Sequence, residues 1–283
     1  SLLTARESRG VHQKNAGVAR TFEPSRRVPR PPFARFGTIP AVKLTFLGGA
    51  DGIGASSTLV EIAGHRILVD CGIRQSGGDP LPFLSRIDEV GGVEAILLTH
   101  AHMDHSGALP VVYPLRAEIP VYMTAATLDI VSILLRDALK IMSSGLEREG
   151  EVPLYTEPAV ERCLSAVRKV PFLTPVDLFA DDVRATFYPA GHILGAASIL
   201  LESTDGTVLF SGDVAVADQL TVPGMMVPPN VRPDAIVVES TYGARQHTSR
   251  SVEEERLVAQ AVEVTSREGA VLFPAFAVGR AQE

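Results

Sequence analysis

One short run of polar residues constrains this chain more than any other part of it. Positions 97–107 read Leu-Leu-Thr-His-Ala-His-Met-Asp-His-Ser-Gly, so three of the seven histidines of the chain fall within six positions. An apolar segment from Val93 to Leu98 leads into this run and is typical of a buried strand. We therefore expect a sheet built around a strand whose end presents imidazoles and a carboxylate in a loop.

The spacing within this cluster predicts a metal site. In an extended chain, His100 and His102 project to the same side. The chain then turns, so that Asp104 and His105 can face a second position nearby. Imidazole and carboxylate together suit zinc, with manganese or iron as the alternatives. A solvated polar turn is the competing interpretation, and the concentration of histidines in one segment argues against it.

The composition restricts the function classes. The chain has 283 residues, of which 46% are hydrophobic, and this is enough for a sizeable core. The formal net charge of −7 excludes a uniformly basic surface that coats nucleic acid, although it allows a local basic groove. The two cysteines are too few for a disulfide framework and predict a reducing, cytoplasmic location. No apolar run reaches the length of a membrane span, so we expect no membrane partner.

The two ends of the chain carry signals of their own. Residues 1–40 lack apolar periodicity and combine arginine with proline, which predicts a flexible basic arm or, alternatively, an arm that touches RNA. The chain begins with Ser1 instead of methionine and stops at Glu283 within a pattern, so we expect a trimmed or split chain.

The apolar periodicity predicts an α/β fold. A glycine-rich loop at 48–54 resembles a dinucleotide-binding fingerprint, but the alternating segment after it indicates a strand where that fingerprint needs a helix. Helices are expected at 126–142, 157–167 and 250–267, and strands at 42–47, 57–62, 66–69, 93–98, 121–123, 183–188, 197–202, 208–210, 235–238 and 271–273. The spacing of the first three strands favours an antiparallel start. Strand runs at both ends of the chain, with helices between them, favour a sandwich of two sheets.

Three further residues stand at strand ends and are candidates for the same site. His192 lies in a loop with Gly191 and Gly195, where glycine lets the backbone come close to whatever the histidine binds. Asp213 ends a buried strand, where a carboxylate can bridge two cations with one oxygen on each. Asp70 has the same placement and is expected to orient a ligand histidine or the metal-bound water. Taken alone, each is an ordinary loop or turn residue, and the histidine cluster favours the site interpretation.

The combined spacing resembles a known family. Asp70, the segment from His100 to His105, His192 and Asp213 are similar to motifs one to four of the metallo-β-lactamase fold. The first cluster alone would also fit glyoxalase-type thioesterases or lactonases. The resemblance implies an α/β fold, an αββα sandwich of two sheets, and a metal-dependent hydrolase.

Two further runs narrow this resemblance to nucleases. The run Glu-Ser-Thr-Tyr-Gly at 239–243 resembles the first signature of the β-CASP branch, whose members carry an inserted cap domain, and Gly-Arg-Ala-Gln-Glu at 279–283 resembles a run within that cap. Segments 106–110 and 190–198 are most similar to the endonuclease subunit of the pre-mRNA 3′-end cleavage factor and its bacterial and archaeal relatives, and less similar to RNase J.

The resemblance implies how the chain divides. After the arm of residues 1–40, residues 41–244 would form the N-terminal part of the metallo-β-lactamase domain, and residues 245–283 the start of a β-CASP cap. Complete members of the family close the site with two later histidines. Past Asp213 this sequence has only His247, which matches neither of them. We therefore expect a missing C-terminal segment of the same enzyme as one partner, and the resemblance also allows for a homodimer.

The resemblance also implies a role for each site residue. The residues expected to ligate two Zn²⁺ ions, with Mn²⁺ as the alternative, are His100, His102 and His192 for the first ion, Asp104 and His105 for the second, and Asp213 as the bridge. The residues expected to take part in catalysis are Asp70, Asp104 and Glu239, and those expected to bind the substrate are Ser240 and Arg280. Members of the family that act in DNA repair tend to have aspartate at the position of Glu239, so the glutamate favours RNA as the partner. Single-stranded RNA is expected in preference to duplex RNA. A hydroxide shared by the two ions would hydrolyse the phosphodiester bond, endonucleolytically, with 5′→3′ exonuclease action as an additional option.

Three other functions stay open at this point. A DNA nuclease of the same fold would cleave single-stranded DNA at least as fast as RNA. A small-molecule hydrolase such as a thioesterase would use the same metals, although the runs at 239–243 and 279–283 argue against it. A catalytically inactive scaffold subunit of an RNA-processing complex would typically have lost metal ligands, whereas every ligand position that this chain reaches is filled.

Overall fold

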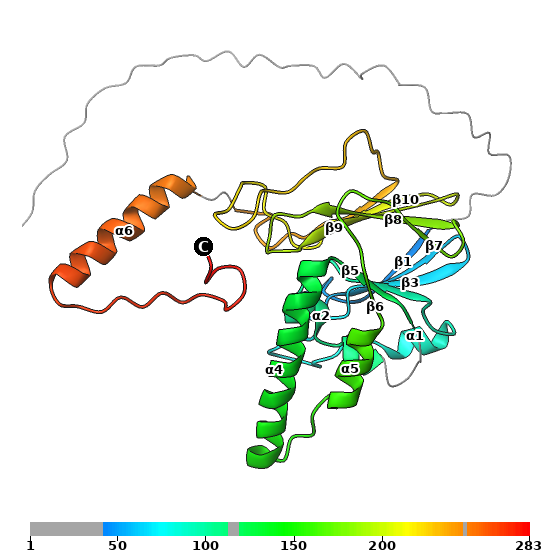
Figure 1. The fold of residues 1–283 in the computed structure, drawn as a ribbon, viewed down its shortest axis with the longest axis horizontal. Helices are drawn as coiled ribbons and strands as arrows, with labels where there is room; N and C mark the ends of the chain where they lie inside the picture. The colour runs from blue at the N-terminus through cyan, green and yellow to red at the C-terminus, as the bar shows by residue number, and fades with distance from the viewer. Residues whose placement is uncertain (1–41, 113–118, 246–247) are drawn as a thin grey trace, which may run out of the picture. The chain divides into compact units, whose positions relative to one another are not determined.

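The structure is a computed structural model that describes residues 42–112, 119–245 and 248–283. The arm predicted at residues 1–40 and His247 lie outside these ranges. Within the described ranges the chain forms two β-sheets and a set of helices, and Figure 1 shows their order along the chain by colour.

The first sheet has six strands in the order β1-β2-β3-β4-β5-β6. Its strands are β1 (Lys43–Gly48), β2 (Ser57–Ile62), β3 (His65–Val69), β4 (Ala95–Leu97), β5 (Val121–Met123) and β6 (Val167–Lys169). The first three strands pair antiparallel, whereas β3 to β6 pair in parallel. Parallel neighbours need crossover connections. These connections hold α1 (Ser85–Glu89), α2 (Met103–Ser106), α3 (Leu109–Val112), α4 (Ala125–Glu149) and α5 (Glu157–Ser165).

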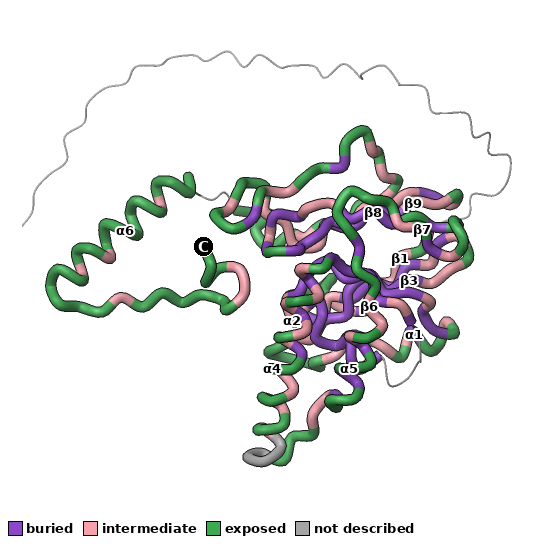
Figure 2. The backbone as a smooth tube through the Cα atoms, viewed as in Figure 1, coloured by how far each residue is buried: buried purple, intermediate pink, exposed green. Residues whose placement is uncertain are grey.

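The second sheet has five strands in the order β11-β10-β9-β8-β7. Its strands are β7 (Val176–Leu178), β8 (Val183–Pro189), β9 (Ala197–Ser203), β10 (Thr207–Phe210) and β11 (Ala235–Val237). All neighbours pair antiparallel except β10 and β11, which are parallel. The last helix, α6 (Arg250–Ser266), has no buried residue, as Figure 2 shows. Among the helices in the described ranges, none combines the length and the apolar character that crossing a bilayer requires.

Two groups of buried apolar side chains lie on opposite faces of the first sheet, because successive residues of a strand point to opposite faces. On one face, Ile67 and Leu97 pack with Phe187 and its neighbours in the second sheet. On the other face, Leu68 packs with side chains of the crossover helices, such as Leu135. Figure 2 shows the buried segments concentrated in the strands of both sheets. This arrangement confirms the predicted α/β sandwich of two sheets.

Most predicted strands and helices lie within two residues of their observed positions, and the exceptions have local reasons. The strand predicted at 271–273 is wrong: this segment forms no strand and Leu272 is exposed, because no strand in the described ranges pairs with it. Helix α4 continues to Glu149, past the predicted end at 142. The run Ser-Ser-Gly at 143–145 has low helix propensity and no apolar periodicity, so it marks a helix end in the sequence although the helix continues through it. Helices α1, α2 and α3 and the strands β6 and β7 are not among the predicted elements. Each of these helices has only four or five residues, too few for apolar periodicity to appear, and charged residues interrupt the sequences Val-Arg-Lys of β6 and Val-Asp-Leu of β7.

His65 ties the start of β3 to the turn between β7 and β8. Its Nδ1 lies 3.0 Å from Glu94 Oε1 and its Nε2 lies 3.2 Å from Asp182 Oδ2, while its ring stacks on Phe179. Burial lowers the pKa of His65, but the hydrogen bonds that its ring donates to the two carboxylates outweigh this and leave the pKa above its ordinary value.

We expect the His65 contact to stabilise the fold mainly at acidic pH. Because the folded pKa lies above the ordinary value of 6.5, the contribution is fully present below that pH and is lost as pH rises through the folded pKa. The free energies of unfolding of the wild-type chain and the His65→Gln variant, measured in urea, should therefore differ more at about pH 5.5 than at about pH 8.5. An equal difference at both pH values would show that the ring contributes by packing alone.

Candidate metal centre

The end of β4 brings the histidine segment to the point where the two sheets meet. Leu97 is fully buried, and two residues later the Thr99 carbonyl accepts a hydrogen bond of 2.8 Å from the amide of Ala197, at the start of β9. Gly212, which follows β10, packs so closely on Thr99 that an added Cβ would lie 2.8 Å from the threonine Cβ. Strands of both sheets are therefore fixed against each other one residue before His100.

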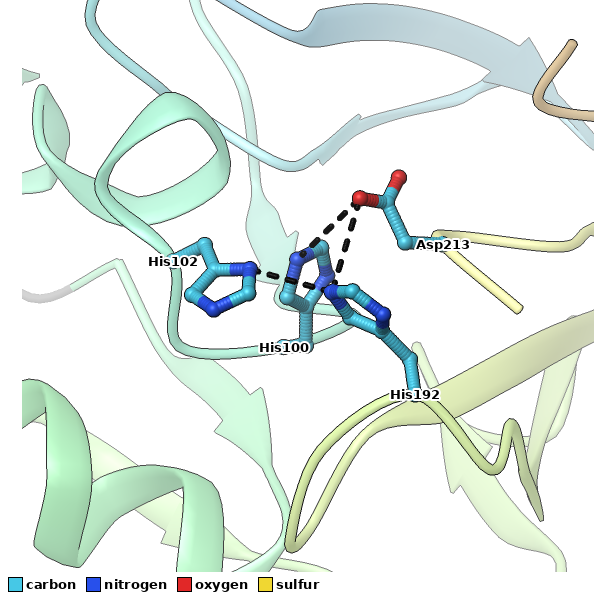
Figure 3. A group of neighbouring side chains, drawn as sticks. All are labelled: His100, His102, His192 and Asp213. Atoms are coloured by element: carbon cyan, nitrogen blue, oxygen red, sulfur yellow. Dashed lines mark hydrogen bonds and ion pairs between the residues drawn. The ribbon is translucent and has the colours of Figure 1, made fainter. Parts of the chain in front are cut away.

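Four side chains, here named the His₃Asp group, converge beside this junction: His100, His102, His192 and Asp213. Each offers one ligand atom, and these atoms all lie within 4.8 Å of one another. Figure 3 shows that they come from three loops and point into one space. His102 Nδ1 lies 3.0 Å from His192 Nε2, and Asp213 Oδ2 lies 3.6 Å from that same Nε2. Donors about 2 Å from a tetrahedral ion are roughly 3.4 Å apart, so this spacing suits a shared cation.

The chemistry of the His₃Asp group also fits a divalent cation. His100 Nε2 is buried and has no hydrogen-bond partner in the described part of the chain, and leaving such an atom unpaired is costly. Burial, reinforced by the neighbouring histidines, lowers the pKa of His100 well below its ordinary value, and burial also lowers the pKa of His192. Both rings therefore stay neutral, which is the form that binds a metal.

His105 lies beside the His₃Asp group and is held by Asp70. His105 Nδ1 lies 2.8 Å from Asp70 Oδ2, and both residues are buried. Thr99 donates to the same carboxylate from its amide, at 2.8 Å, and from its hydroxyl, at 2.8 Å. Asp70 has a φ of 60°, which is uncommon for a residue other than glycine. Asp70 thus fixes the orientation of the imidazole and leaves its Nε2 facing the site.

Asp213 directs its two carboxylate oxygens to different sides. Oδ2 faces the His₃Asp histidines, while Oδ1 lies 3.4 Å from His105 Nε2. Asp104 Oδ2 lies 4.0 Å from the same nitrogen. Burial lowers the pKa of His105, but Asp70 and Asp213 outweigh it and raise the pKa well above its ordinary value, so these carboxylates hold a proton on the ring. A position that attracts a proton so strongly can attract a metal cation in its place.

The loop that carries His192 is fixed at both of its glycines. Gly191 has a φ of 74°, and an added Cβ would lie 2.4 Å from a carbonyl oxygen in the loop after β10. The carbonyl of Gly195 accepts hydrogen bonds from the hydroxyls of Thr124, at 2.8 Å, and Thr127, at 2.9 Å, beside the start of α4. Close packing on both sides therefore sets the position of His192.

Two contacts that the sequence did not indicate support His192 and His102, the first at its backbone and the second at its ring. Gln219 Nε2 donates hydrogen bonds to the carbonyl of Gly191 and, at 2.8 Å, to the carbonyl of His192. The Val278 carbonyl lies 3.3 Å from His102 Nε2, so that Nδ1 of this ring faces the His₃Asp group. A lone loop glutamine and a backbone carbonyl belong to no motif, so sequence reasoning had no signal for either.

The other predicted site residues lie at the edge of the centre or at the surface. Glu239 follows β11, and its Oε2 accepts a hydrogen bond of 2.9 Å from the Thr241 amide. Its charge is close enough to His192 to act on the pKa of that ring. Ser240 and Arg280 are exposed. No contact within residues 42–112, 119–245 and 248–283 joins either of them to the His₃Asp group.

Comparison with known proteins adds independent information. Residues 59–217 match a family model described as the metallo-β-lactamase superfamily domain. The chain is 32% identical over 246 residues to cleavage and polyadenylation specificity factor subunit 3 of Dictyostelium discoideum, an alignment covering 86% of this chain and 31% of that protein. It is 33% identical over 249 residues to endoribonuclease ysh1 of Emericella nidulans, covering 86% and 28% of the two chains. It is 34% identical over 251 residues to transcription termination factor FttA of Methanothermobacter thermautotrophicus, covering 85% and 38%.

These relatives are much longer than the part that aligns. The chain spans between 28% and 38% of their lengths. Among solved structures, a protein of unknown function from Enterococcus faecalis is similar with a TM-score of 0.42 and 18% identity, covering 62% of this chain and 44% of that one, and this similarity is too low to carry an argument.

Proposed function

The chain belongs to the metallo-β-lactamase superfamily, and from this premise we propose that the protein is a metal-dependent ribonuclease that hydrolyses phosphodiester bonds of RNA. The observation that carries the proposal is the convergence of three imidazoles and a carboxylate from three loops where the two sheets meet. The name of the Emericella relative, an endoribonuclease, supports the reaction class.

The proposed cofactors are two Zn²⁺ ions, with Mn²⁺ as the alternative. The residues proposed to hold them are His100, His102 and His192 for the first ion, Asp104 and His105 for the second, and Asp213 between the two. Support comes from the two directions of the Asp213 oxygens and from the cation-attracting surroundings of His105 Nε2. When bound, such ions polarise a phosphate and lower the pKa of a water molecule toward about 7.

The side chains around the ions would orient the metal ligands, transfer protons and contact the RNA. Asp70 accepts a hydrogen bond from His105 Nδ1 and so directs the Nε2 of that ring toward the site. Glu239, at the edge of the centre, is proposed to take part in proton transfer. Ser240 and Arg280 are proposed to contact RNA, because an exposed hydroxyl and guanidinium are both suited to phosphate oxygens.

The proposed substrate is RNA, single-stranded in preference to duplex. Cleavage would expel the 3′ oxygen of the preceding nucleotide and leave a 5′-phosphate and a 3′-hydroxyl. Endonuclease action is the main proposal and 5′→3′ exonuclease action an additional one. Glutamate at 239 and the names of the relatives support RNA over DNA.

The proposed domain division follows the two runs that resemble the β-CASP branch. Residues 41–244 are proposed to belong to the metallo-β-lactamase domain, and residues 245–283 to the start of a cap. A further C-terminal segment of the same enzyme is proposed to complete the site, and a homodimer is the proposed assembly. The cytoplasmic location stays a prediction.

The test of this function compares RNA and DNA oligonucleotides of the same sequence as substrates of the full-length enzyme. Metal is stripped with a chelator and then restored as Zn²⁺ or Mn²⁺. We expect no cleavage without metal, recovery on reloading, and faster cleavage of RNA than of DNA. Equal or faster cleavage of DNA would identify a DNA nuclease instead. Turnover of a glutathione thioester without cleavage of either nucleic acid would identify a small-molecule hydrolase.

Metal content gives a check that does not depend on the substrate. Elemental analysis after gentle purification should find about two transition-metal ions for each active site. A protein that contains no metal and does not take it up would instead fit a scaffold subunit of an RNA-processing complex.

A further inference from the structure

One side chain of the loop between β10 and β11 is hydrogen-bonded to the backbone of the loop that carries His192. Gln219 donates from a single amide nitrogen to the carbonyls of Gly191 and His192. That nitrogen carries two hydrogens, so the two bonds use its whole donor capacity. The two carbonyls belong to the peptide groups on either side of the His192 Cα. Gln219 therefore fixes the backbone from which the imidazole projects.

A second set of contacts fixes the turn that carries Gln219. Glu283 Oε2 accepts a hydrogen bond of 2.6 Å from the Leu220 amide, and Oε1 accepts one of 3.0 Å from the Thr221 amide and another from the Thr221 hydroxyl. Arg250, at the start of α6, places Nη2 3.1 Å from Glu283 Oε2. Burial raises the pKa of Glu283, but the hydrogen bonds from Thr221 and Leu220 outweigh it and bring the pKa to about 2. The carboxylate is therefore ionised, and fully able to accept, at neutral pH.

The turn that carries Glu283 also lies directly against the metal centre. Its Val278 carbonyl faces His102 Nε2 at 3.3 Å. Gly279 approaches Ile193, the neighbour of His192, so closely that an added Cβ would lie 2.6 Å from Ile193 Cγ2. One turn thus touches both ligand loops, while the nearest motif residue in it, Arg280, is exposed.

We propose that Gln219 and Glu283 are positioning residues that hold His192 in the orientation required for metal binding. Glu283 fixes the turn of Gln219, and Gln219 transmits this constraint to the peptide groups around His192. The proposal rests on the proposed function, because it takes His192 to be a metal ligand. Neither side chain contacts the His₃Asp group itself, so both act through the backbone of the loop.

The physical reason is the entropy of the ligand loop. A loop that is already held in its bound conformation loses little conformational freedom when the ion binds, whereas a loosened loop loses more. Groups that orient metal ligands typically change metal affinity by about 10- to 100-fold when they are removed. Without Gln219, the carbonyls of Gly191 and His192 lose the donor that holds them. Because they belong to the peptide groups on either side of the His192 Cα, any motion of these groups also moves the imidazole.

The test measures the affinity of the full-length protein for Zn²⁺ by competition with a coloured chelator. The visible spectrum of the Co²⁺-loaded protein reports the geometry around the ion. We expect Gln219→Ala to weaken Zn²⁺ binding by about tenfold or more and to change the Co²⁺ spectrum. Gln219→Glu keeps the size of the side chain but removes both donors, so it should weaken binding at least as much. Leu220→Ala is the matched control and should change neither, because its side chain is 76% exposed and its amide is untouched.

A second comparison tests whether Glu283 acts through Gln219. Glu283→Gln keeps the size of the side chain and removes its charge, and it should weaken Zn²⁺ binding in the wild-type background. In the Gln219→Ala background it should have little further effect, because residues that act on one loop are not additive. Fully additive effects would overturn the link between the two residues.

Failure of this inference and failure of the proposed function give different results. In one case the wild-type protein binds Zn²⁺, and both Gln219 variants, shown by circular dichroism to be folded, bind it equally well and give an unchanged Co²⁺ spectrum. The positioning role is then wrong, while the ribonuclease proposal stands. If the wild-type protein binds neither ion, the function on which the inference rests is overturned.

Discussion

Replacing His102 by alanine in the full-length enzyme is expected to slow RNA cleavage by at least about a thousandfold without unfolding the protein. His102 Nδ1 lies 3.0 Å from His192 Nε2, so its loss removes one of three imidazoles from the first proposed ion. An ion contributes several kcal/mol to a transition state that carries charge on phosphate oxygens, and about 4 kcal/mol corresponds to a thousandfold in rate. Asp104→Ala, at the second proposed ion, should act in the same direction.

The measurement is the single-turnover cleavage rate of a short RNA, with circular dichroism as the check on folding. His65→Gln is a matched control, because His65 is also hydrogen-bonded to carboxylates but makes its contacts at Glu94 and Asp182, away from the His₃Asp group. Its cleavage rate should equal that of the wild type. Wild-type rates from both the His102 and the Asp104 variants would overturn the assignment of the metal centre.

Asp70→Ala is expected to lower the free energy of unfolding by about 3–5 kcal/mol, because it breaks a buried ion pair by removing one partner. The side chains of His105 and Asp70 are 10% and 5% exposed, and their atoms lie 2.8 Å apart. The same substitution leaves the amide and the hydroxyl of Thr99 without their acceptor. The loss therefore leaves His105 Nδ1 and the Thr99 amide without their acceptor at the junction of the sheets.

Urea denaturation of the metal-free protein at neutral pH measures this effect without a contribution from ion binding. Asp70→Asn should lose less, because asparagine keeps one acceptor oxygen and tolerates the positive φ of this position. Asp51→Ala, at an exposed position of the glycine-rich loop, should change little. A loss from Asp70→Ala below about 1 kcal/mol would mean that water replaces the carboxylate at no great cost.

Much of the fold could be predicted from local patterns. The predicted bounds of β2 and β5 match the structure because each strand is a short β-branched or apolar run ended by turn residues. β6 and β7 could not be predicted, since charged residues interrupt both short strands, and the strands form by pairing with β5 and β8. The predicted strand at 271–273 is wrong because apolar composition alone cannot show whether another strand pairs with the segment, and none in the described part of the chain does.

Local sequence patterns likewise predicted only part of the candidate site. Residue types and strand ends indicated the four members of the His₃Asp group, and the structure brings them within 4.8 Å of one another, although their roles stay predictions. The two directions of the Asp213 oxygens and the contacts of Gln219 and Val278 could not be predicted. They depend on how loops that are distant in sequence pack together, and a single glutamine or a backbone carbonyl has no sequence signature.

The proposed ligand side chains are buried to unequal degrees, and this would set the order in which they release a bound ion. His100, with 1% of its side chain exposed, follows a strand hydrogen-bonded on both sides, whereas the side chains of His192 and Asp213 are 26% and 29% exposed. In hydrogen–deuterium exchange, amides of such a central strand exchange only when the whole domain opens, while loop amides exchange through small local fluctuations. An ion should therefore detach first from His192 and Asp213 and last from His100. Its residence time should follow the opening rate of the outer loops and should be nearly independent of substitutions that change global stability.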